Sequence, residues 1–463
     1  MMDWRKLLST ARPGEDDGSA EGHAEGPART AFQKDWDRVV FSSAFRRLQD
    51  KTQVHALPES DYVRTRLTHS LEVSSVGRTL GAAVGQVVMQ RRTDLGAVAT
   101  PADFGHIVAA AALAHDIGNP PFGHFGEETI RFWFADAGGG RRALEPLGAA
   151  ERADFLGFEG NAQGFRILTR LQNWRDQGGL RLTAATLGAF SKYPRPSRIA
   201  PPPALAPATA SDCASAKIGF FQAEKDLFAG IAETLGLIAR DGILPEGDRS
   251  RAWCRHPLAF LVEAADDICY QIVDLEDGYK LGRIQFAEAE ALLVAVIGGT
   301  PPRYASIAEA PRRISYLRGH AIGSLTDAVV QVFLDRETEI MAGTLTQDLL
   351  SQTPAQATLR EIAVLTDSRV FSTRSRYEVE IGGVEIMTTL LEAFVAAVEE
   401  VAAAKAGGGR LSPRARTLAR ILPEPLQLDP PYLRLLQVTD FVSGMTDTYA
   451  LTQYRRLRGG IRL

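Results

Sequence analysis

An adjacent pair of metal-binding residue types, His115 and Asp116, closes the apolar stretch "FGHIVAAAALAHDIG". Imidazole nitrogens and carboxylate oxygens are donors that divalent metal ions accept at about 2 Å. Gly118 and the prolines of "GNPP" follow directly and end the predicted helix. The backbone is therefore free to turn both side chains toward one ion. An HD dipeptide alone occurs by chance in many proteins, so further donors are needed.

Two other segments offer those donors. His69 lies in "RTRLTHSLEV", and "EAADDICYQIVDLED" spans 263–277. In the second segment Asp266, Tyr270 and Asp274 are four residues apart and line one face of a predicted helix. Carboxylates on such an otherwise apolar helix are costly unless a metal, a ligand or hydrogen-bond donors meet them.

Helices are the elements that must position these residues. Apolar residues recur at intervals of three to five along 64–91, and similar patterns predict helices over 222–240, 257–280, 286–297, 320–342 and 384–405. Strand signals are sparse. The best candidate for a small β-hairpin is "RYEVEIGGVEI" at 376–386, with the Gly pair at its turn. The predicted fold class is all-α, with at most this hairpin.

Breaks in composition suggest the domain organisation. We expect a mobile N-terminal segment over 1–30, a catalytic core over 31–300 and a C-terminal helical region over 301–463 packed on that core. The proline-rich stretch 194–216 is predicted to be a loop within the core. A further break at 404–413 contains three consecutive glycines.

Bulk composition narrows the function class. The 463 residues carry a formal net charge of −4, which gives no general attraction to nucleic acid or anionic membranes. The three cysteines are too few and too scattered for a disulfide framework or a zinc ribbon. Apolar runs are far shorter than the roughly 20 residues that span a bilayer, and the first ten residues lack the apolar core of a signal peptide. We therefore expect a cytoplasmic protein.

Several motifs together resemble the HD-domain phosphohydrolase superfamily, in which His, His-Asp and Asp hold a divalent metal in a helical core. Within it, the chain resembles the deoxynucleoside-triphosphate (dNTP) triphosphohydrolases, the bacterial dGTPase-like proteins. The likeness covers most of 28–280 and returns near the C-terminus. The motifs that carry it are "DWDRVVFSSAFRRLQDKTQV", "RTRLTHSLEV", "HDIGNPPFGHFGE", "FEGNAQGFRIL", "KYP" at 192–194, "GFFQAEKD", "EAADDICYQIVDLED" and "DFVSGMTDTYA".

The resemblance implies an HD-domain helical core and a ligand set for Mg²⁺, Mn²⁺ or Co²⁺. His69, His115 and Asp116 match directly, and the fourth ligand is one of Asp266 and Asp267. The family ligand is followed by Tyr four residues on and Asp eight residues on, and here only Asp266 has that spacing. We therefore choose Asp266.

The implied reaction splits a dNTP into a deoxynucleoside and inorganic triphosphate. His124 suits the general acid that protonates the leaving 5′-oxygen, because histidine titrates near neutral pH, and Glu127 is placed to orient it. The triphosphate needs cations, and arginine binds phosphate through a bidentate fork. Arg66 is the first choice because it lies one helical turn before His69, and the other candidates are Arg46, Arg47, Arg64 and Lys192. By family position, Tyr270 would crowd C2′, and Asp274 and Gln53 would bind the 3′-hydroxyl.

The resemblance also implies a homo-oligomer, with a hexamer as one form, and activation by a second dNTP or by single-stranded DNA. No membrane partner is expected. Two alternative functions stay open from the sequence. One is another HD enzyme, a 5′-nucleotidase or phosphodiesterase, which would keep the ligands without needing the "GHFGE" segment. The other is a non-catalytic nucleotide or single-stranded DNA binder that uses the same pocket.

Overall fold

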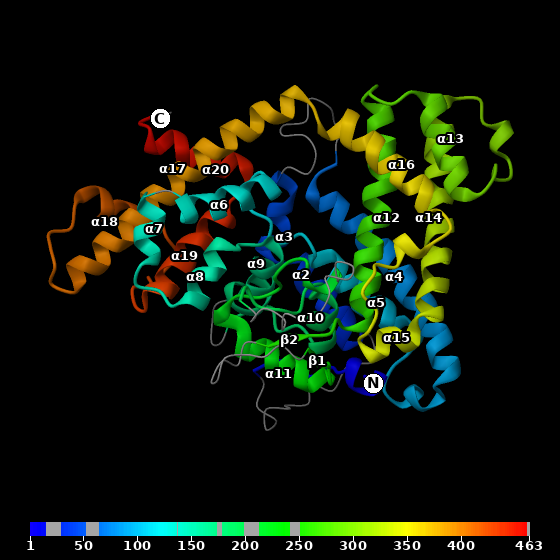
Figure 1. Ribbon diagram of the computed structural model, residues 1–463, viewed down its shortest axis with the longest axis horizontal. Coiled ribbons are helices and arrows are strands. Elements are labelled where there is room, and N and C mark those ends of the chain that lie inside the picture. The colour runs from blue at the N-terminus through cyan, green and yellow to red at the C-terminus, as the bar shows by residue number, and fades with distance from the viewer. Residues whose placement is uncertain are drawn as a thin grey trace, which may run out of the picture.

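Helices account for nearly all regular structure in the chain (Figure 1). The computed structural model describes residues 1–14, 29–51, 64–136, 138–173, 178–198, 213–240 and 251–460. Within these ranges two short strands, β1 (Ala239–Arg240) and β2 (Ala252–Trp253), pair antiparallel, with Ala239 opposite Trp253. The predicted all-α fold class is confirmed.

Two long helices, α4 (Arg66–Arg91) and α5 (Pro101–Ala114), pack closely against each other. Each begins with a capping box, at Thr65 and at Thr100, which satisfies the first backbone N–H groups. A β-carbon at Gly81 of α4 would lie 2.6 Å from the carbonyl oxygen of Phe104 on α5. Glycine therefore lets the two backbones approach. His69 lies on α4, and His115 directly follows the last residue of α5.

The α4–α5 pair lies inside the first of two hydrophobic clusters. The other helices that contribute buried residues to this first cluster are α1 (Trp4–Leu7), α2 (Ala31–Val40), α3 (Ser43–Arg47), α9 (Gly160–Arg166), α10 (Ala184–Phe190), α11 (Lys225–Leu235), α12 (Pro257–Lys280), α13 (Phe286–Ile297), α14 (Ala310–Asp335), α15 (Glu337–Ala342) and α16 (Gln356–Thr366).

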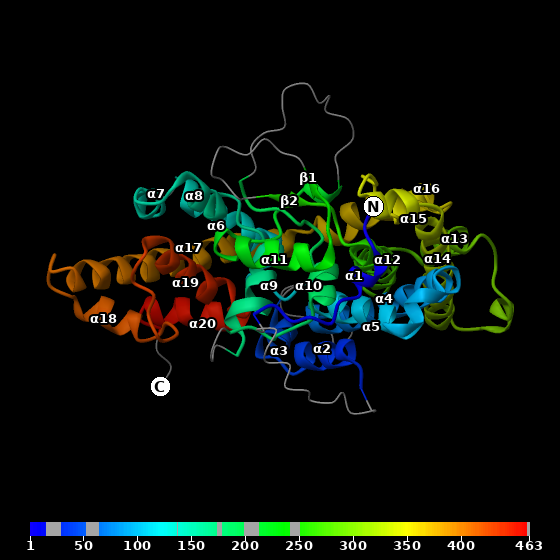
Figure 2. The same ribbon diagram turned by 90° about the horizontal axis from the view of Figure 1, so that it is seen from below.

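The second cluster joins helices from early and late parts of the chain. The helices that contribute buried residues to it are α6 (His124–Asp136), α7 (Gly138–Leu144), α8 (Ala149–Leu156), α9 through Ala162, α17 (Arg374–Lys405), α18 (Pro413–Ala419), α19 (Pro431–Ser443) and α20 (Asp447–Leu457). Figures 1 and 2 place α18 and α13 at opposite ends of the long axis, so the two clusters lie side by side along it.

A buried carboxylate, Asp154 of α8, ties the second cluster together. It accepts hydrogen bonds from the Ser197 hydroxyl (2.5 Å), the Gln222 backbone N–H (2.8 Å) and the Tyr432 hydroxyl (2.5 Å). Burial raises the pKa of Asp154 to about 7, although these hydrogen bonds favour ionisation. A protonated carboxyl at acidic pH is therefore part of this network.

The two hydrophobic clusters do not follow the order of the chain, and the expected domain division at residue 300 stays a prediction. Helices α14 to α16 pack in the first cluster with α4, whereas α6 to α8 pack in the second cluster with the C-terminal helices. The start of the segment expected to be mobile, 1–30, also packs on the core, because Trp4 and Leu7 are buried in α1. Residues 15–28 lie outside the described ranges, as do 199–212 of the proline-rich stretch.

The predicted hairpin at 376–386 is wrong, because these residues form the first part of α17. The alternation of apolar and charged residues suggested a strand, but the helix continues into a stretch whose apolar face is buried, from Met387 to Val398. The Gly pair also has another purpose. A β-carbon at Gly383 would lie 2.9 Å from Cγ of Phe122, so glycine admits that ring to the helix surface.

Helix α17 is apolar enough to raise the question of a membrane. By length and composition its residues Tyr377–Lys405 could span one, but 56% of the most apolar window is buried within the protein. It contacts α6, α18, α19 and α20.

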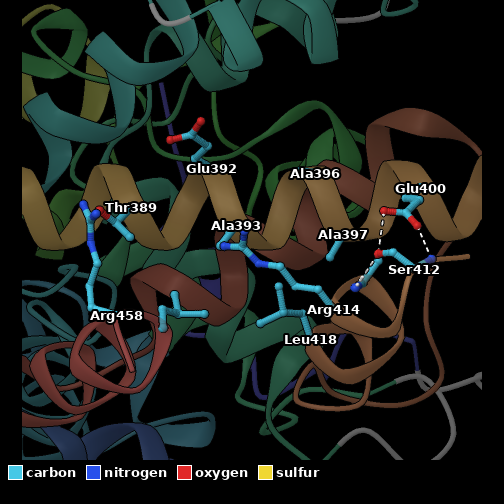
Figure 3. A pocket seen from close by; sticks show the side chains of 12 residues that line it. Thr389, Glu392, Ala393, Ala396, Ala397, Glu400, Ser412, Arg414, Leu418 and Arg458 are labelled. Atoms are coloured by element: carbon cyan, nitrogen blue, oxygen red, sulfur yellow. Dashed lines mark hydrogen bonds between the residues drawn. The ribbon is translucent and has the colours of Figure 1, made fainter. Parts of the chain in front are cut away.

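A cavity of about 500 Å³ lies between α17, α18 and α20 (Figure 3). Arg414 and Arg458 extend beside α17 there, and the Ser412 hydroxyl donates to Glu400 at 3.0 Å.

Candidate metal centre and active site

Three of the predicted ligands converge from three helices. His69 comes from α4, His115 follows the last residue of α5, and Asp266 comes from α12. Oδ1 of Asp266 lies 3.1 Å from Nε2 of His69 and 3.4 Å from Nε2 of His115. Donors held at about 2 Å by one ion are about 3 Å apart. The donor set therefore fits a single divalent ion.

The fourth predicted ligand, Asp116, borders this group. Its Oδ1 lies 3.5 Å from Nε2 of His115. The Asn119 side-chain amide donates to Oδ1 at 2.6 Å, and the Arg66 guanidinium donates to Oδ2 at 2.6 Å. Burial opposes ionisation of Asp116, but the charge of the Arg66 guanidinium outweighs it and holds the pKa of Asp116 well below the usual range. The carboxylate is therefore ionised and held in place.

The groups around Asp266 keep its carboxylate ionised. Burial alone would raise the pKa of Asp266, but Lys192, whose ammonium donates to Oδ2 at 2.7 Å, and the two histidines hold that pKa well below 3.8. Burial lowers the pKa of His115, partly offset by Asp266, so its imidazole is neutral and able to bind a metal. For His69, burial also acts to lower the pKa, but the hydrogen bond and charge of Asp266 outweigh it and raise the pKa.

The turn after the HD pair delivers the predicted acid. Phe122 and Gly123 both have positive φ, 63° and 62°, and α6 begins at His124. Nδ1 of His124 lies 2.9 Å from Oε2 of Glu127. The His124 side chain is 70% exposed, whereas that of Glu127 is 2% exposed. The buried carboxylate therefore holds the Nδ1 edge of the imidazole, and the Nε2 edge is open to a ligand.

Glu127 is itself fixed from a second direction. The backbone N–H of Gly160, the first residue of α9, donates to its Oε1 at 2.6 Å. Burial opposes ionisation of Glu127, but the hydrogen bond from His124 and that from Gly160 help to lower its pKa. Glu127 is thus an ionised and immobile partner for His124.

The remaining predicted residues are distributed around the cluster. Tyr270, 43% exposed, stacks on Phe371 with ring centroids 5.6 Å apart. Asp274 is buried, and burial, partly offset by His69, raises its pKa to about 8. Its Oδ2 has no hydrogen-bond partner among the described residues. Arg66 is buried beside Asp116, and Gln53 lies outside the described ranges.

Several site contacts were not predicted from the sequence. The Asn119 amide that donates to Asp116 lies inside the "HDIGNPPFGHFGE" segment. Its position, three residues after a predicted ligand, was the sequence signal that could have indicated this contact. The contact of Lys192 with Asp266 and the burial of Lys51 left no local signal. Burial, reinforced by the charge of Arg47, lowers the pKa of Lys51 to about 7.

Comparison with known proteins agrees with this geometry. A family model described as "HD domain" matches residues 66–150. A deoxyguanosinetriphosphate triphosphohydrolase-like protein of Synechocystis sp. is 45% identical, and one of Pseudomonas aeruginosa is 42% identical, each aligned over 99% of both chains. The chain belongs to the deoxyguanosinetriphosphate triphosphohydrolase-like family. The resemblance drawn from the sequence is confirmed.

A more distant relative is also informative. The deoxyguanosinetriphosphate triphosphohydrolase of Yersinia pestis is 30% identical, aligned over 98% of this chain and 99% of its own. This chain is a dGTPase-like HD phosphohydrolase, and its segment matched by the HD-domain model contains His69, His115, Asp116, His124 and Glu127. Asp266 lies outside it on α12, so the donor group depends on a helix beyond the HD segment.

Proposed function

We propose that this protein hydrolyses dNTPs, with dGTP as one substrate, to a deoxynucleoside and inorganic triphosphate. The observation that carries the proposal is the turn that connects His115, a member of the candidate metal-binding group, to an exposed histidine backed by a buried carboxylate. The names of the relatives, which include a deoxyguanosinetriphosphate triphosphohydrolase, support the same substrate class. Water oxygen would bond to the α-phosphorus, the bond from phosphorus to O5′ would break, and O5′ would receive a proton.

His69, His115, Asp116 and Asp266 would hold a divalent ion such as Mg²⁺, Mn²⁺ or Co²⁺. Bound there, the ion would supply Lewis-acid stabilisation of charge on the α-phosphate. Arg66 and Lys192 add two positive charges beside the carboxylates. Both are nearly buried, so their charges are poorly screened by water and suit a polyanionic substrate.

His124 would donate the proton to O5′. Its Nδ1 is engaged by Glu127, which leaves Nε2 as the nitrogen that faces a ligand. The ionised Glu127 lies against Nδ1 and thereby orients the imidazole, as general-acid catalysis requires. General-acid groups contribute about 10²–10⁴-fold to rate, so loss of His124 should cost that factor in kcat.

The sugar would be read by α12. Tyr270 and Asp274 lie one and two turns after Asp266 on the same helix face. An exposed phenol there would crowd C2′ and exclude a ribose hydroxyl. A largely protonated Asp274 can donate as well as accept at the 3′-hydroxyl, which matches its raised pKa. Gln53 is the proposed third contact.

Product analysis with labelled water tests the reaction directly. The purified protein is incubated with each dNTP, singly and mixed, with Mg²⁺, Mn²⁺ or Co²⁺ in H₂¹⁸O, and products are separated by ion exchange. We expect deoxynucleoside without ¹⁸O and triphosphate with ¹⁸O, both lost in Asp116→Ala but not in Asp226→Ala, an exposed carboxylate on α11. Label in the deoxynucleoside would contradict attack at phosphorus, and orthophosphate or pyrophosphate would move the bond that is cleaved.

The assembly state is also proposed. Tyr377, Ile381 and Val384 form an exposed apolar stripe on α17, with Ile381 71% exposed. Exposed apolar patches commonly mark interfaces. We expect a homo-oligomer, with a hexamer as the leading form, measurable by light scattering after gel filtration. The comparison of single and mixed dNTPs shows whether a second nucleotide activates the enzyme, and addition of single-stranded DNA tests the other proposed activator.

A further inference from the structure

The turn between Asp116 and His124 is held by a segment more than three hundred residues later in the chain. The backbone N–H of Phe122 donates to Oδ1 of Asp447 at 2.9 Å. Phe122 has φ of 63°, which for a bulky residue is strained and persists only where the surroundings enforce it. Its ring lies against Gly383 of α17. Asp447 therefore helps to enforce the strained backbone two residues before His124.

A second contact reaches the same turn. The buried Lys51 ammonium donates to the backbone carbonyl of Ser443, at 3.1 Å, and to the backbone carbonyl of Asn119. A buried ammonium requires such acceptors, so the two carbonyls are held at a fixed separation. Because the side chain of Asn119 donates to Asp116, this bridge also fixes a residue that positions a predicted ligand.

A third contact reaches the carboxylate behind His124. Asp440 accepts from the Arg166 guanidinium, with Nε 2.9 Å from Oδ1 and Nη2 2.9 Å from Oδ2, and from the Gln163 amide at 2.9 Å. Both partners lie on α9. The first residue of that helix, Gly160, donates to Glu127. Asp440 thus helps to position α9, whose first residue donates the hydrogen bond to Glu127.

We propose that residues 440–447, at the corner between α19 and α20, are a positioning element that sets the distance between the metal-binding pair and His124. Asp440, Ser443 and Asp447 each act through another residue and do not reach the reacting atoms. This accounts for the "DFVSGMTDTYA" segment, to which neither the metal centre nor the substrate contacts assign a role. The catalytic consequence rests on the proposed function, whereas the ordering of the turn does not.

Asp447 offers the sharpest test. Asp447→Ala removes the acceptor for the Phe122 N–H, and Asp447→Asn keeps a side-chain oxygen there. Asp447 also lies in the first turn of an eleven-residue helix, where an acid stabilises the helix end. Asp226→Ala controls for this effect, because Asp226 is an exposed first-turn acid of α11, which also has eleven residues.

Hydrogen exchange by mass spectrometry reads the turn without any assumption about the reaction. We expect peptides covering 117–127 to exchange at least tenfold faster in Asp447→Ala, to recover in Asp447→Asn, and to be unchanged in Asp226→Ala. Equal protection of the turn in Asp447→Ala and wild type would overturn the proposal. An inactive wild-type protein would count against the proposed function, and the exchange result would still decide this one.

Kinetics give a second, independent outcome. We expect Asp447→Ala to lower kcat about 10- to 100-fold with KM for the dNTP within about threefold, because a misplacement near 1 Å costs about 10²-fold. Asp447→Asn should recover most of kcat. In a His124→Ala background, Asp447→Ala should cost less than twofold further, since the residue it positions is gone. Full additivity of the two changes would overturn the positioning role.

Discussion

Replacing Gly160 with alanine should disable the site by moving two side chains. A β-carbon there would lie 2.4 Å from Oδ1 of Asn119 and 2.7 Å from Oε1 of Glu127, whereas ordinary contacts begin at 3.4 Å. The two oxygens must therefore retreat by about 1.0 Å and about 0.7 Å, which loosens the contacts to Asp116 and His124. Gly160 lacks a positive φ, so the backbone itself accepts alanine.

The expected size follows from these shifts. A displacement near 1 Å at a reacting centre costs about 10²-fold, or about 2.7 kcal/mol of transition-state stabilisation. Overpacking a filled site costs about 1–3 kcal/mol of folding free energy. We therefore expect kcat for dGTP to fall about 100-fold, with KM changed less than threefold, in a protein that is still folded at 25 °C.

The assay combines steady-state release of triphosphate with denaturant unfolding. Gly138→Ala is the matched control, because Gly138 also begins a seven-residue helix and a β-carbon there would meet no described atom within 4 Å. It should keep wild-type kinetics. Wild-type kcat in a folded Gly160→Ala protein would refute the reasoning, and so would a loss of activity that only follows the loss of folded protein.

Four further outcomes follow from the structure. Chelation of divalent ions should abolish turnover, and added Mn²⁺ should restore it in wild type but not in Asp266→Ala. The pKa of Asp154, about 7 when folded, exceeds the value near 3.9 of an unfolded aspartate, so its contribution to stability is complete below about pH 4 and is lost as pH rises through 7. In urea unfolding, the free energy of unfolding of the wild type should therefore fall by up to about 4 kcal/mol relative to that of Asp154→Asn between about pH 4 and pH 8. A difference between the two proteins that does not change with pH would contradict the raised pKa of Asp154. Phe394 is buried, and its ring centroid lies 5.1 Å from that of Phe441. Phe394→Ala leaves a cavity there and should lower the free energy of unfolding by about 3–5 kcal/mol. Ile381→Glu should reduce the oligomer seen by light scattering without loss of helical circular dichroism.

The sequence predicted those parts of the site that rest on local spacing. Adjacent His115 and Asp116 need only the end of one helix, and Asp266, Tyr270 and Asp274 need only a helical repeat. The His124–Glu127 contact likewise spans one helical turn. Local geometry therefore brought most of the candidate residues to their observed places.

What the sequence did not predict depends on distant partners. The alternating residues of 376–386 fit a strand locally, and only burial of the following residues and the approach of Phe122 favour a helix. The residues 320–342, expected to form one helix, belong to two helices, α14 and α15, because the helix is interrupted at Arg336. The contacts of Lys51 and Asp440 join segments hundreds of residues apart, for which a single sequence holds no local pattern.

The mixed membership of the second cluster has a consequence for biosynthesis. Helix α6 is synthesised about 250 residues before the buried part of α17, a delay on the order of tens of seconds at about 5–20 residues per second. During this time Trp133, Phe134 and Phe155 lack the partners that later cover them. We therefore expect the nascent chain to pack α4 against α5 early, and to bury these aromatic residues and order the His124 side of the site only after α17, α19 and α20 have been made.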